Sequence, residues 1–456
     1  MKKTIVINVV GLTPSLIGEF TPFLADWSAN AKTLSIVPEL PAVTCSAQST
    51  YLTGVPPSTH GIVANGWYFK DECEIKFWRQ SNKLVQAPKI WETARRQDST
   101  FSCANLFWWY NMYSSVDVAV TPRPMYPADG RKIPDIYTCP LALRFELQEE
   151  LGQFPLFEFW GPRTSIRASQ WIADCAKLVE AKSNPDLTLI YLPHLDYNLQ
   201  RTGTAASDVA RDLQEIDGVC QDLIEFYEKR DAQIIVLSEY GITPVNRPIA
   251  LNRLFFEEGL ISIREEMGRY LLDAGTSAAF AVADHQIAHV YLNDPEKLTT
   301  VRKILESTEG IAEILDTEGK KGAHLDHPRS GDFVVIAKPD AWFTYYYWLN
   351  DTNAPDFART VDIHRKPGYD PVELFIDPSL PLPHLKAAWI LLKKQLGFRY
   401  LMDLIPLTPE LVKGSHGGLP PSPAEGPLLI TRQSGITDQS SLAATEVHDL
   451  ILKHIF

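Results

Sequence analysis

Three apolar, β-branched runs constrain the fold of this chain more than any other feature. They are TIVINVVGL (4–12), LTLIYLPHLD (187–196) and AQIIVLSEYG (232–241). Each run is apolar until its carboxyl end, where polar residues appear, and helical patterns such as residues 207–230 lie between them. Strands buried on both faces are typical of parallel sheets, which bind ligands at the carboxyl edge. We therefore predict an α/β fold with a mostly parallel central sheet, helices on both of its faces, and a site at that edge.

The composition is that of a globular protein and excludes several classes of function. Of 456 residues, 45% are hydrophobic and 22% are charged, and the formal net charge is -13. A protein that binds nucleic-acid backbones needs a basic face, so we expect no nucleic-acid polymer as a partner. No apolar run approaches the length of about 18 residues that spans a bilayer, so we expect no membrane span.

The first residues and the cysteines indicate the cellular compartment of the protein. The amino-terminal apolar stretch is short, contains Asn8 and lacks a cleavage site of small residues, so we interpret it as a buried strand rather than a signal peptide. The six cysteines are scattered and form no C-x-x-C pair, which favours a reducing cytoplasm.

Two segments depart from the alternation of strands and helices. Residues 66–165 are rich in Trp, Tyr, Phe and Pro, and residues 258–345 are irregular, with strand-like runs such as AFAVADHQIAHVYL. We expect 258–345 to form an inserted, smaller α+β region that caps the fold. Residues 1–257 and 346–456 then form the main α/β domain, with the aromatic segment 66–165 near its site.

Four polar positions at the expected sheet edge are candidates for a functional site. Thr44 stands where an extended segment turns into a predicted helix, Asp196 and Glu239 end two of the apolar runs, and His416 lies in GSHGG. A hydroxyl at a helix N-terminus is well placed near a phosphate, and clustered carboxylates and an imidazole suit a divalent cation. Each position also has a structural interpretation, as a helix cap for Thr44 and as a solvated loop residue for the other three.

The most specific motif is LTGVPPSTHGIVANGWYF, residues 52–69, which contains T-G-x-x-P-x-x-H-G-I followed by Asn65. Together with HLDYNLQ around Asp196, SEYG around Glu239 and GSHG around His416, it resembles the type I phosphodiesterase / nucleotide pyrophosphatase branch of the alkaline phosphatase superfamily. The resemblance extends from the first strand to the last helix, and it implies an alkaline phosphatase-like fold.

The resemblance also implies roles for these residues. In that family two zinc ions lie side by side, and a threonine attacks phosphorus to form a covalent phospho-enzyme that water then hydrolyses. By this likeness Thr44 is the nucleophile and Asn65 contacts the substrate phosphate. Asp196, Glu239 and His416 occupy metal-ligand positions.

Three positions depart from the family pattern. The aspartate of the first strand falls on Val10, a histidine ligand falls on Gln200, and the histidine of a D-H pair falls on Tyr240. One interpretation is that ligands come from elsewhere, first from Asp362 and His364, whose spacing of two places them on one face of a strand. DHQIAH (284–289) and HLDH (324–327) are weaker sources. The other interpretation is a degenerate phosphodiesterase that binds an anionic ligand without turnover.

We predict a metal-dependent hydrolase of phosphodiester, pyrophosphate or related phosphate esters. Its catalytic residue is Thr44, its substrate-binding residue Asn65, and its metal ligands Asp196, Glu239, His364 and His416. The cofactor is one or two divalent ions, with zinc preferred, and the substrate is a small phosphate ester or a nucleotide-like molecule. The alternatives are the non-catalytic binder and a phosphotransferase, although no second phosphate acceptor site is recognisable in the sequence.

Overall fold

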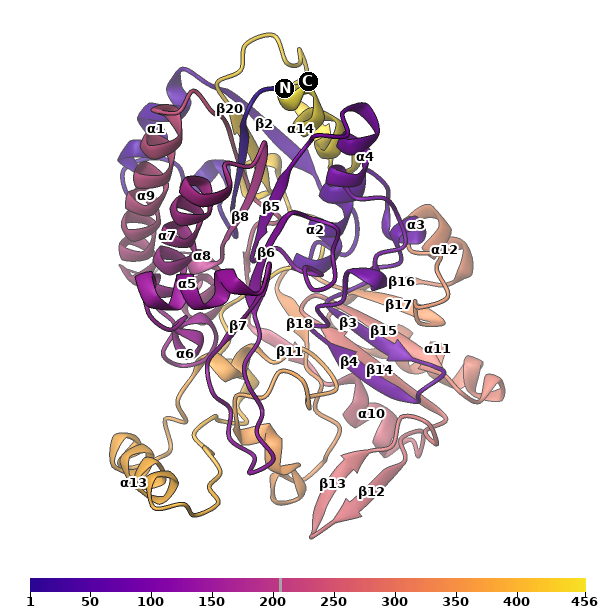
Figure 1. The fold of residues 1–456 in the computed structure, drawn as a ribbon. Coiled ribbons are helices and arrows are strands. Elements are labelled where there is room, and N and C mark those ends of the chain that lie inside the picture. Colours follow the sequence, from indigo (N-terminus) through magenta and orange to yellow (C-terminus); the bar gives the residue numbers. More distant parts are fainter. Residues whose placement is uncertain (205–206) are drawn as a thin grey trace.

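The computed structural model describes residues 1–204 and 207–456. Its main element is a nine-stranded sheet (Figure 1). In spatial order the strands are β21 (Ser441–Ala443), β2 (Lys32–Val37), β20 (Leu428–Thr431), β9 (Gln233–Leu237), β1 (Thr4–Val9), β8 (Leu187–Leu192), β5 (Cys103–Leu106), β6 (Val118–Pro122) and β7 (Ile136–Cys139).

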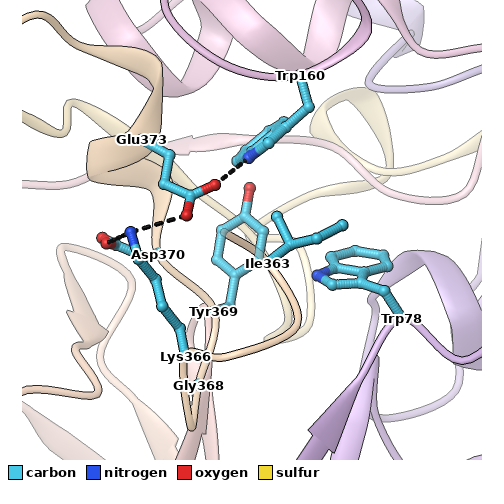
Figure 2. Close-up of a pocket in the computed structure, with 8 residues that line it drawn as sticks. All are labelled: Trp78, Trp160, Ile363, Lys366, Gly368, Tyr369, Asp370 and Glu373. Carbon is cyan, nitrogen blue, oxygen red and sulfur yellow. Dashed lines mark hydrogen bonds and ion pairs between the residues drawn. The ribbon is translucent and has the colours of Figure 1, made fainter. Parts of the chain in front are cut away.

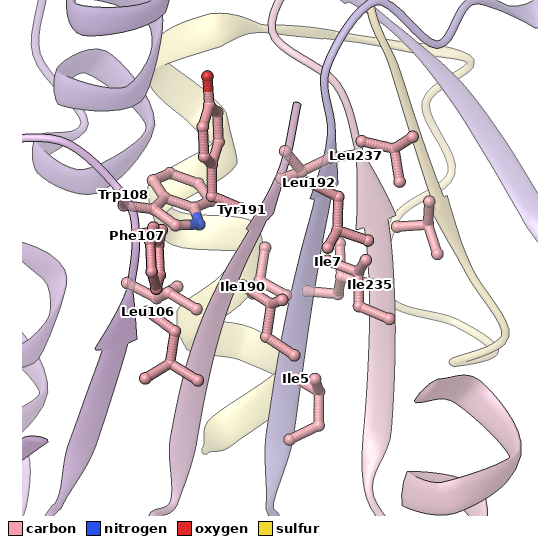
Figure 3. Packing of buried hydrophobic residues seen from close by; sticks show 14 of the residues in the cluster. Ile5, Ile7, Leu106, Phe107, Trp108, Ile190, Tyr191, Leu192, Ile235 and Leu237 are labelled. Carbon is pink, nitrogen blue, oxygen red and sulfur yellow. The ribbon is translucent and has the colours of Figure 1, made fainter. Parts of the chain in front are cut away.

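The centre of this sheet is parallel, as predicted. Strands β9, β1, β8, β5 and β6 pair in parallel, whereas β20 and β7 run antiparallel to their neighbours. All three apolar runs lie side by side in it, and Val9 pairs with Leu192, so their carboxyl ends reach the same edge. Figure 3 shows buried side chains of these strands packed against one another, among them Ile7, Ile190 and Ile235. Burial of such side chains contributes about 1.5–3 kcal/mol each.

Helices cover both faces of the sheet (Figure 1). One face carries α1 (Pro22–Ala29), α5 (Ala142–Leu151), α7 (Ile166–Ser183), α8 (His194–Thr202) and α9 (Ser207–Glu228), and the other carries α2 (Thr44–Thr53), α4 (Ile90–Gln97) and α14 (Val447–Ile455). The predicted helix at 207–230 is therefore confirmed as α9. One boundary was wrong: the second apolar run ends as a strand at Leu192, because Pro193 has no N–H for the ladder, and Asp196 lies in the first turn of α8.

A second, antiparallel sheet of four strands lies beside the first (Figure 1). Its order is β14 (Ala279–Asp284), β15 (Ile287–Leu292), β17 (Phe333–Ala337) and β16 (Ile311–Leu315). Helices α10 (Leu251–Glu257), α11 (Leu298–Ser307) and α12 (Thr317–Gly322) belong to the same part of the chain. This sheet has a hydrophobic core of its own around Phe280 and Val335. The division of the chain into a main domain and an insert at 258–345 remains a proposal.

Among the described residues, four further pairs of short strands lie outside the two larger sheets. They are β3 (Gly66–Phe69) with β4 (Glu74–Phe77), β10 (Thr243–Pro244) with β19 (Gly414–Ser415), β11 (Arg247–Ile249) with β18 (Ala341–Phe343), and β12 (Ile263–Glu266) with β13 (Arg269–Leu272). Two short helices, α3 (Pro57–His60) and α6 (Leu156–Phe159), complete the set of α-helices with α13.

Two peripheral features matter below. Helix α13 (Pro383–Gln395) stands apart from both sheets, at the lower left of Figure 1. The two ends of the chain meet, since the Lys2 N–H donates to the Ile455 carbonyl at 2.8 Å (Figure 1). Across residues 1–204 and 207–456, every helix is too short or too polar to cross a bilayer.

Candidate active site

Thr44 is the first residue of α2, and its side chain does not cap that helix. The N-cap position belongs to Val43, whose backbone is extended, and no side-chain cap bond is formed there. The Thr44 Oγ1 instead lies 3.1 Å from the Tyr240 hydroxyl, which follows β9. Thr44 is only 4% exposed. The capping interpretation therefore does not explain this threonine, and its hydroxyl is held toward the carboxyl edge of the sheet.

A chain of hydrogen bonds runs on from Thr44. The Tyr240 hydroxyl donates to Asp196 Oδ1 at 3.2 Å, and Gln200 Nε2 donates to Asp196 Oδ2 at 2.7 Å. Gln200 follows Asp196 by four residues on α8, so both side chains lie on one face of that helix. Burial raises the pKa of Asp196 to about 7. Since a carboxylate only accepts, Tyr240 donates to Asp196 and Thr44 donates to Tyr240, which directs the Thr44 proton toward a base.

Glu239 lies beside this chain, at the end of β9. Its Oε1 accepts from Asn8 Nδ2 at 2.5 Å and from Gln48 Nε2 at 2.6 Å, whereas its Oε2 has no hydrogen-bond partner. Gln48 is held in turn by the Trp109 N–H. Burial raises the pKa of Glu239 to about 8. Glu239 is therefore a buried acid fixed by amide donors, not a residue of a solvated turn.

His416 follows β19 and lies against Tyr240. Its Nδ1 donates to the Ala42 carbonyl at 2.8 Å, and its buried Nε2 has no partner. Burial lowers the pKa of His416 to about 3. The ring stacks on Tyr240 with centroids 3.5 Å apart and planes 6° apart. On its other side lies His285 at 3.7 Å, and Tyr369 stacks on His285 at 3.7 Å. We call Tyr240, His416, His285 and Tyr369 the ring column.

Asn65 reaches the site through the backbone of α2. Its Oδ1 accepts from the N–H of Cys45, the residue after Thr44, at 2.9 Å. Its own N–H and its Nδ2 donate to the two oxygens of Asp284, at 2.7 and 3.1 Å. Burial raises the pKa of Asp284 to about 7. Asn65 thus links the start of α2 to the end of β14.

The structure brings together Thr44, Asn65, Asp196, Glu239 and His416, but His364 makes a different contact. The His364 Nδ1 lies 3.4 Å from the Phe77 carbonyl, and the Asp362 carboxylate lies 3.8 Å from Arg365. The same segment supplies Tyr369, whose hydroxyl donates to Gln200 Oε1 at 2.9 Å. His364 as a metal ligand stays a prediction.

The segment DHQIAH (284–289) was predicted to be a weaker source of site residues, yet it supplies Asp284 and His285 to the site. The signal was present, because an Asp-His pair ends the strand β14 in the way that the family's D-H pair ends another strand. The histidines of HLDH (324–327) lie elsewhere, with His324 bound to Glu39 and His327 to Gln86.

The type I phosphodiesterase / nucleotide pyrophosphatase family matches residues 4–370. This chain belongs to that family. The prediction made from residues 52–69 and the later strand ends is therefore confirmed, and the family is one of hydrolases that generally depend on divalent metals.

Sequence relatives within the family are distant. A pyrophosphatase/phosphodiesterase of Schizosaccharomyces pombe is 25% identical over 243 residues, which cover 52% of this chain and 44% of the relative. Ectonucleotide pyrophosphatase/phosphodiesterase 2 of Saccharomyces cerevisiae is 24% identical over 368 residues, covering 75% of this chain and 65% of the relative. The chain thus spans less than two thirds of the length of these relatives.

Solved structures confirm the alkaline phosphatase-like fold. Phosphonoacetate hydrolase from Sinorhizobium meliloti, in complex with phosphonoformate, has a TM-score of 0.62 at 13% identity, covering 99% of this chain and 96% of that one. Murine ectonucleotide pyrophosphatase / phosphodiesterase 5 has a TM-score of 0.59 at 13% identity, covering 100% and 95%. An inactive variant of the murine protein, solved with AMP, has a TM-score of 0.60 at 13% identity, with the same coverage.

The residues present do not fit the metal centre expected of this family. Asp196 has both oxygens occupied by Tyr240 and Gln200, and Val10 offers no ligand atom. Within the part of the chain that the structure describes, one group brings three metal-binding side chains within 4.8 Å of one another, and it is His194, Asp212 and Glu215. The predicted set Asp196, Glu239, His364 and His416 forms no such group in this arrangement.

A pocket lined by aromatic and charged side chains opens at the far end of the ring column (Figure 2). Its lining residues are Trp78, Trp160, Ile363, Lys366, Gly368, Tyr369, Asp370 and Glu373. Lys366 is buried between Asp370 and Glu373, each at 2.7 Å, and Trp160 donates to Glu373. The indoles of Trp78 and Trp160 also lie near Tyr369, with ring centroids 6.1 and 5.7 Å away.

Proposed function

We propose that this chain hydrolyses phosphodiesters, pyrophosphates or related phosphate esters, with Thr44 as the group that attacks phosphorus. The observation that carries the proposal is the hydrogen-bond path from Thr44 through Tyr240 to Asp196. A threonine hydroxyl is a weak nucleophile until its proton is removed, and this path leads to a carboxylate with a pKa of about 7. The start of α2 supplies backbone N–H groups that favour a phosphate.

The proposed reaction has two steps. In the first, the Thr44 oxygen bonds to phosphorus, and the Thr44 proton passes to Tyr240 while the Tyr240 proton passes to Asp196. The bond from phosphorus to the leaving group breaks, and that group departs as an alkoxide or phosphate anion that takes a proton from solvent. In the second, water attacks the phospho-threonine and releases one proton to solvent, the Thr44–phosphorus bond breaks, and Thr44 regains its proton from Asp196 through Tyr240. Asn65 positions the start of α2 through Cys45.

We also propose that hydrolysis depends on one or two divalent ions, with zinc preferred. This part of the proposal is an expectation from the family. The predicted ligands do not converge on one point, so we assign no step to an ion. Elemental analysis of the purified protein tests this separately. Less than about one tightly bound ion per chain, with no gain in rate on adding zinc or manganese, would remove metal dependence from the proposal.

The proposed substrate is a small phosphate ester or a nucleotide-like molecule. The complex of the murine neighbour with AMP supports this class, and Trp78 and Trp160 supply aromatic rings to the pocket lining, against which a base can pack. The cytoplasm is the proposed location, because all six cysteines are free thiols.

The test is the rate of hydrolysis of bis(p-nitrophenyl) phosphate by Thr44→Ala. We expect a loss of at least about 100-fold, since the attacking oxygen is gone, with an unchanged circular dichroism spectrum. Thr53→Ala is the matched control, because Thr53 ends the same helix and bonds only to the Ser49 carbonyl. A Thr44→Ala protein with the wild-type rate would refute the assignment.

A second candidate function is the binding of an anionic ligand without turnover. It is favoured by the ring column, which fills the space beside Thr44 with stacked rings, and by the low exposure of the site residues. Calorimetry with AMP separates the two. Binding by the wild-type chain, with no hydrolysis in the presence of either metal, would favour the binder.

A further inference from the structure

Helix α13 presents its apolar side chains to solvent. Leu385, Trp389, Leu392 and Leu396 are spaced by four, three and four residues and form one stripe along it. Their exposed fractions are 64%, 56%, 43% and 64%. A surface helix ordinarily turns such a stripe toward the core, and here only Ile390, on the opposite side, is buried. The stripe therefore has no partner within the described chain.

The flanking residues extend this apolar surface. Leu382 and Phe398 are 61% and 64% exposed, and Leu401 is also exposed. Figure 1 shows the segment projecting away from both sheets. The proposed active site lies elsewhere, at the edge of the nine-stranded sheet, so the projection is not part of the catalytic machinery.

The charge of the same segment differs from that of the whole chain. Residues 378–402 contain no Asp or Glu and carry Lys386, Lys393, Lys394 and Arg399, although the chain has a formal net charge of -13. Lys386 pairs with Asp403 at 2.9 Å. Lys393 and Lys394 lie over the rings of Trp389 and Tyr400, 5.5 and 5.6 Å from their centroids. By helical spacing Lys386 and Lys393 lie beside the apolar stripe, whereas Lys394 lies on the opposite side of the helix.

We propose that α13 and its flanks bind the surface of a membrane that contains anionic lipids. Helices that lie in the bilayer interface combine a face of Leu, Trp and Phe with lysines and arginines that reach the headgroups. The stripe supplies that face, and Lys393, Lys394 and Arg399 supply charge complementary to anionic headgroups. Attachment of this kind is peripheral and requires no spanning helix.

Co-sedimentation with vesicles tests the proposal. We expect the wild-type chain to pellet with vesicles of phosphatidylcholine mixed with phosphatidylglycerol, and to pellet less with phosphatidylcholine alone. Replacing the stripe, by Leu385→Gln, Trp389→Gln, Leu392→Gln and Leu396→Gln together, should reduce the bound fraction at least tenfold without changing the circular dichroism spectrum. Lys393→Gln with Lys394→Gln should remove the preference for the anionic vesicles.

The control replaces exposed apolar residues elsewhere. Phe145→Gln on α5 and Leu298→Gln on α11 remove side chains of 59% and 47% exposure and should leave vesicle binding unchanged. Three results would overturn the proposal. They are no binding to either vesicle, equal binding to both, and self-association without vesicles that the stripe variant abolishes, which would make a second copy the partner.

Discussion

Tyr240 contacts the proposed nucleophile and the proposed base at the same time. Its hydroxyl lies between Thr44 and Asp196, and its ring is stacked against His416. At this position the family carries a metal-binding histidine. A phenol cannot replace that ligand well, but it can pass a proton between a hydroxyl and a carboxylate, which gives the substitution a chemical role.

Tyr240→Phe tests that role. The variant keeps the ring but removes the hydroxyl, so Thr44 loses its acceptor and Asp196 Oδ1 loses a donor. We expect the hydrolysis rate to fall by about 10²–10⁴-fold, the usual range for loss of acid–base assistance. Tyr227→Phe removes an equally buried hydroxyl, which bonds to the Ala176 carbonyl away from the site, and should leave the rate unchanged. A Tyr240→Phe enzyme with full activity would contradict the proton path.

His60, the histidine of the T-G-x-x-P-x-x-H-G-I motif, has a structural role here. Its Nδ1 accepts from the Ile62 N–H at 3.0 Å, and its Nε2 lies 3.0 Å from Thr50 Oγ1 on α2. Burial, with smaller contributions from His327 and Arg329, lowers the pKa of His60 to about 3. The ring is thus neutral and fixes the turn after α3 to the helix that begins with Thr44.

The lowered pKa of His60 makes the free energy of unfolding depend on pH. Below the ordinary histidine value of about 6.5 the unfolded chain takes up a proton that folded His60 does not, so stability is present above that pH and is lost as the pH falls toward 3. Lowering the pH from 7 to 5 should reduce the free energy of unfolding of the wild-type chain by about 2 kcal/mol more than that of His60→Asn. The asparagine keeps an acceptor for the Ile62 N–H. Urea unfolding of both proteins at the two pH values measures these reductions. Equal reductions in the two proteins would show that His60 has the same pKa in the folded and the unfolded chain.

At the scale of elements, the central strands were predictable, whereas the end of β8 and the side-chain packing were not. The apolar runs gave β1, β8 and β9, and the polar residues after them placed Asp196 and Glu239 near Thr44. The spacing argument for Asp362 and His364 assumed a strand, whereas residues 361–370 form neither helix nor strand. Tyr369 from that segment enters the site instead, and no local pattern predicts its stacking on His285, which follows β14.

The glycines of GSHGG are not equivalent, and this gives a prediction for the element that carries His416. A Cβ at Gly414 would lie 2.1 Å from the Leu199 carbonyl, because β19 passes directly over the end of α8. Gly414→Ala should therefore displace the strand, lower the free energy of unfolding by about 1–3 kcal/mol and reduce activity.

Gly418→Ala is the matched control for that change. It adds the same methyl group four residues later, where the nearest atom is 3.7 Å away. Its unfolding midpoint and hydrolysis rate should stay at the wild-type values. Equal effects of the two substitutions would show that the close approach at Gly414 does not hold the His416 loop in place.

At the scale of the whole molecule, the site belongs to both sheets. The nine-stranded sheet supplies Glu239 and Tyr240, and the four-stranded sheet supplies Asp284 and, just after its first strand, His285. The bonds from Asn65 to Asp284 join the two across α2. This joint construction was not predictable from the sequence, because it depends on how two separately cored parts of the chain dock.

Because Lys2 and Ile455 are joined by a hydrogen bond, the two ends of the chain lie close together. The ends could therefore be linked, and the chain opened at another point, without moving the helices and strands. A short linker of glycine and serine should join the ends without strain, and new ends can be opened at the hairpin tip between β12 and β13, where Met267 is fully exposed. We expect such a circular permutant to fold, to hydrolyse the same ester, and to melt within a few degrees of the parent by calorimetry. A permutant that fails to fold would show that the chain must be made from β1 onward to form its central sheet.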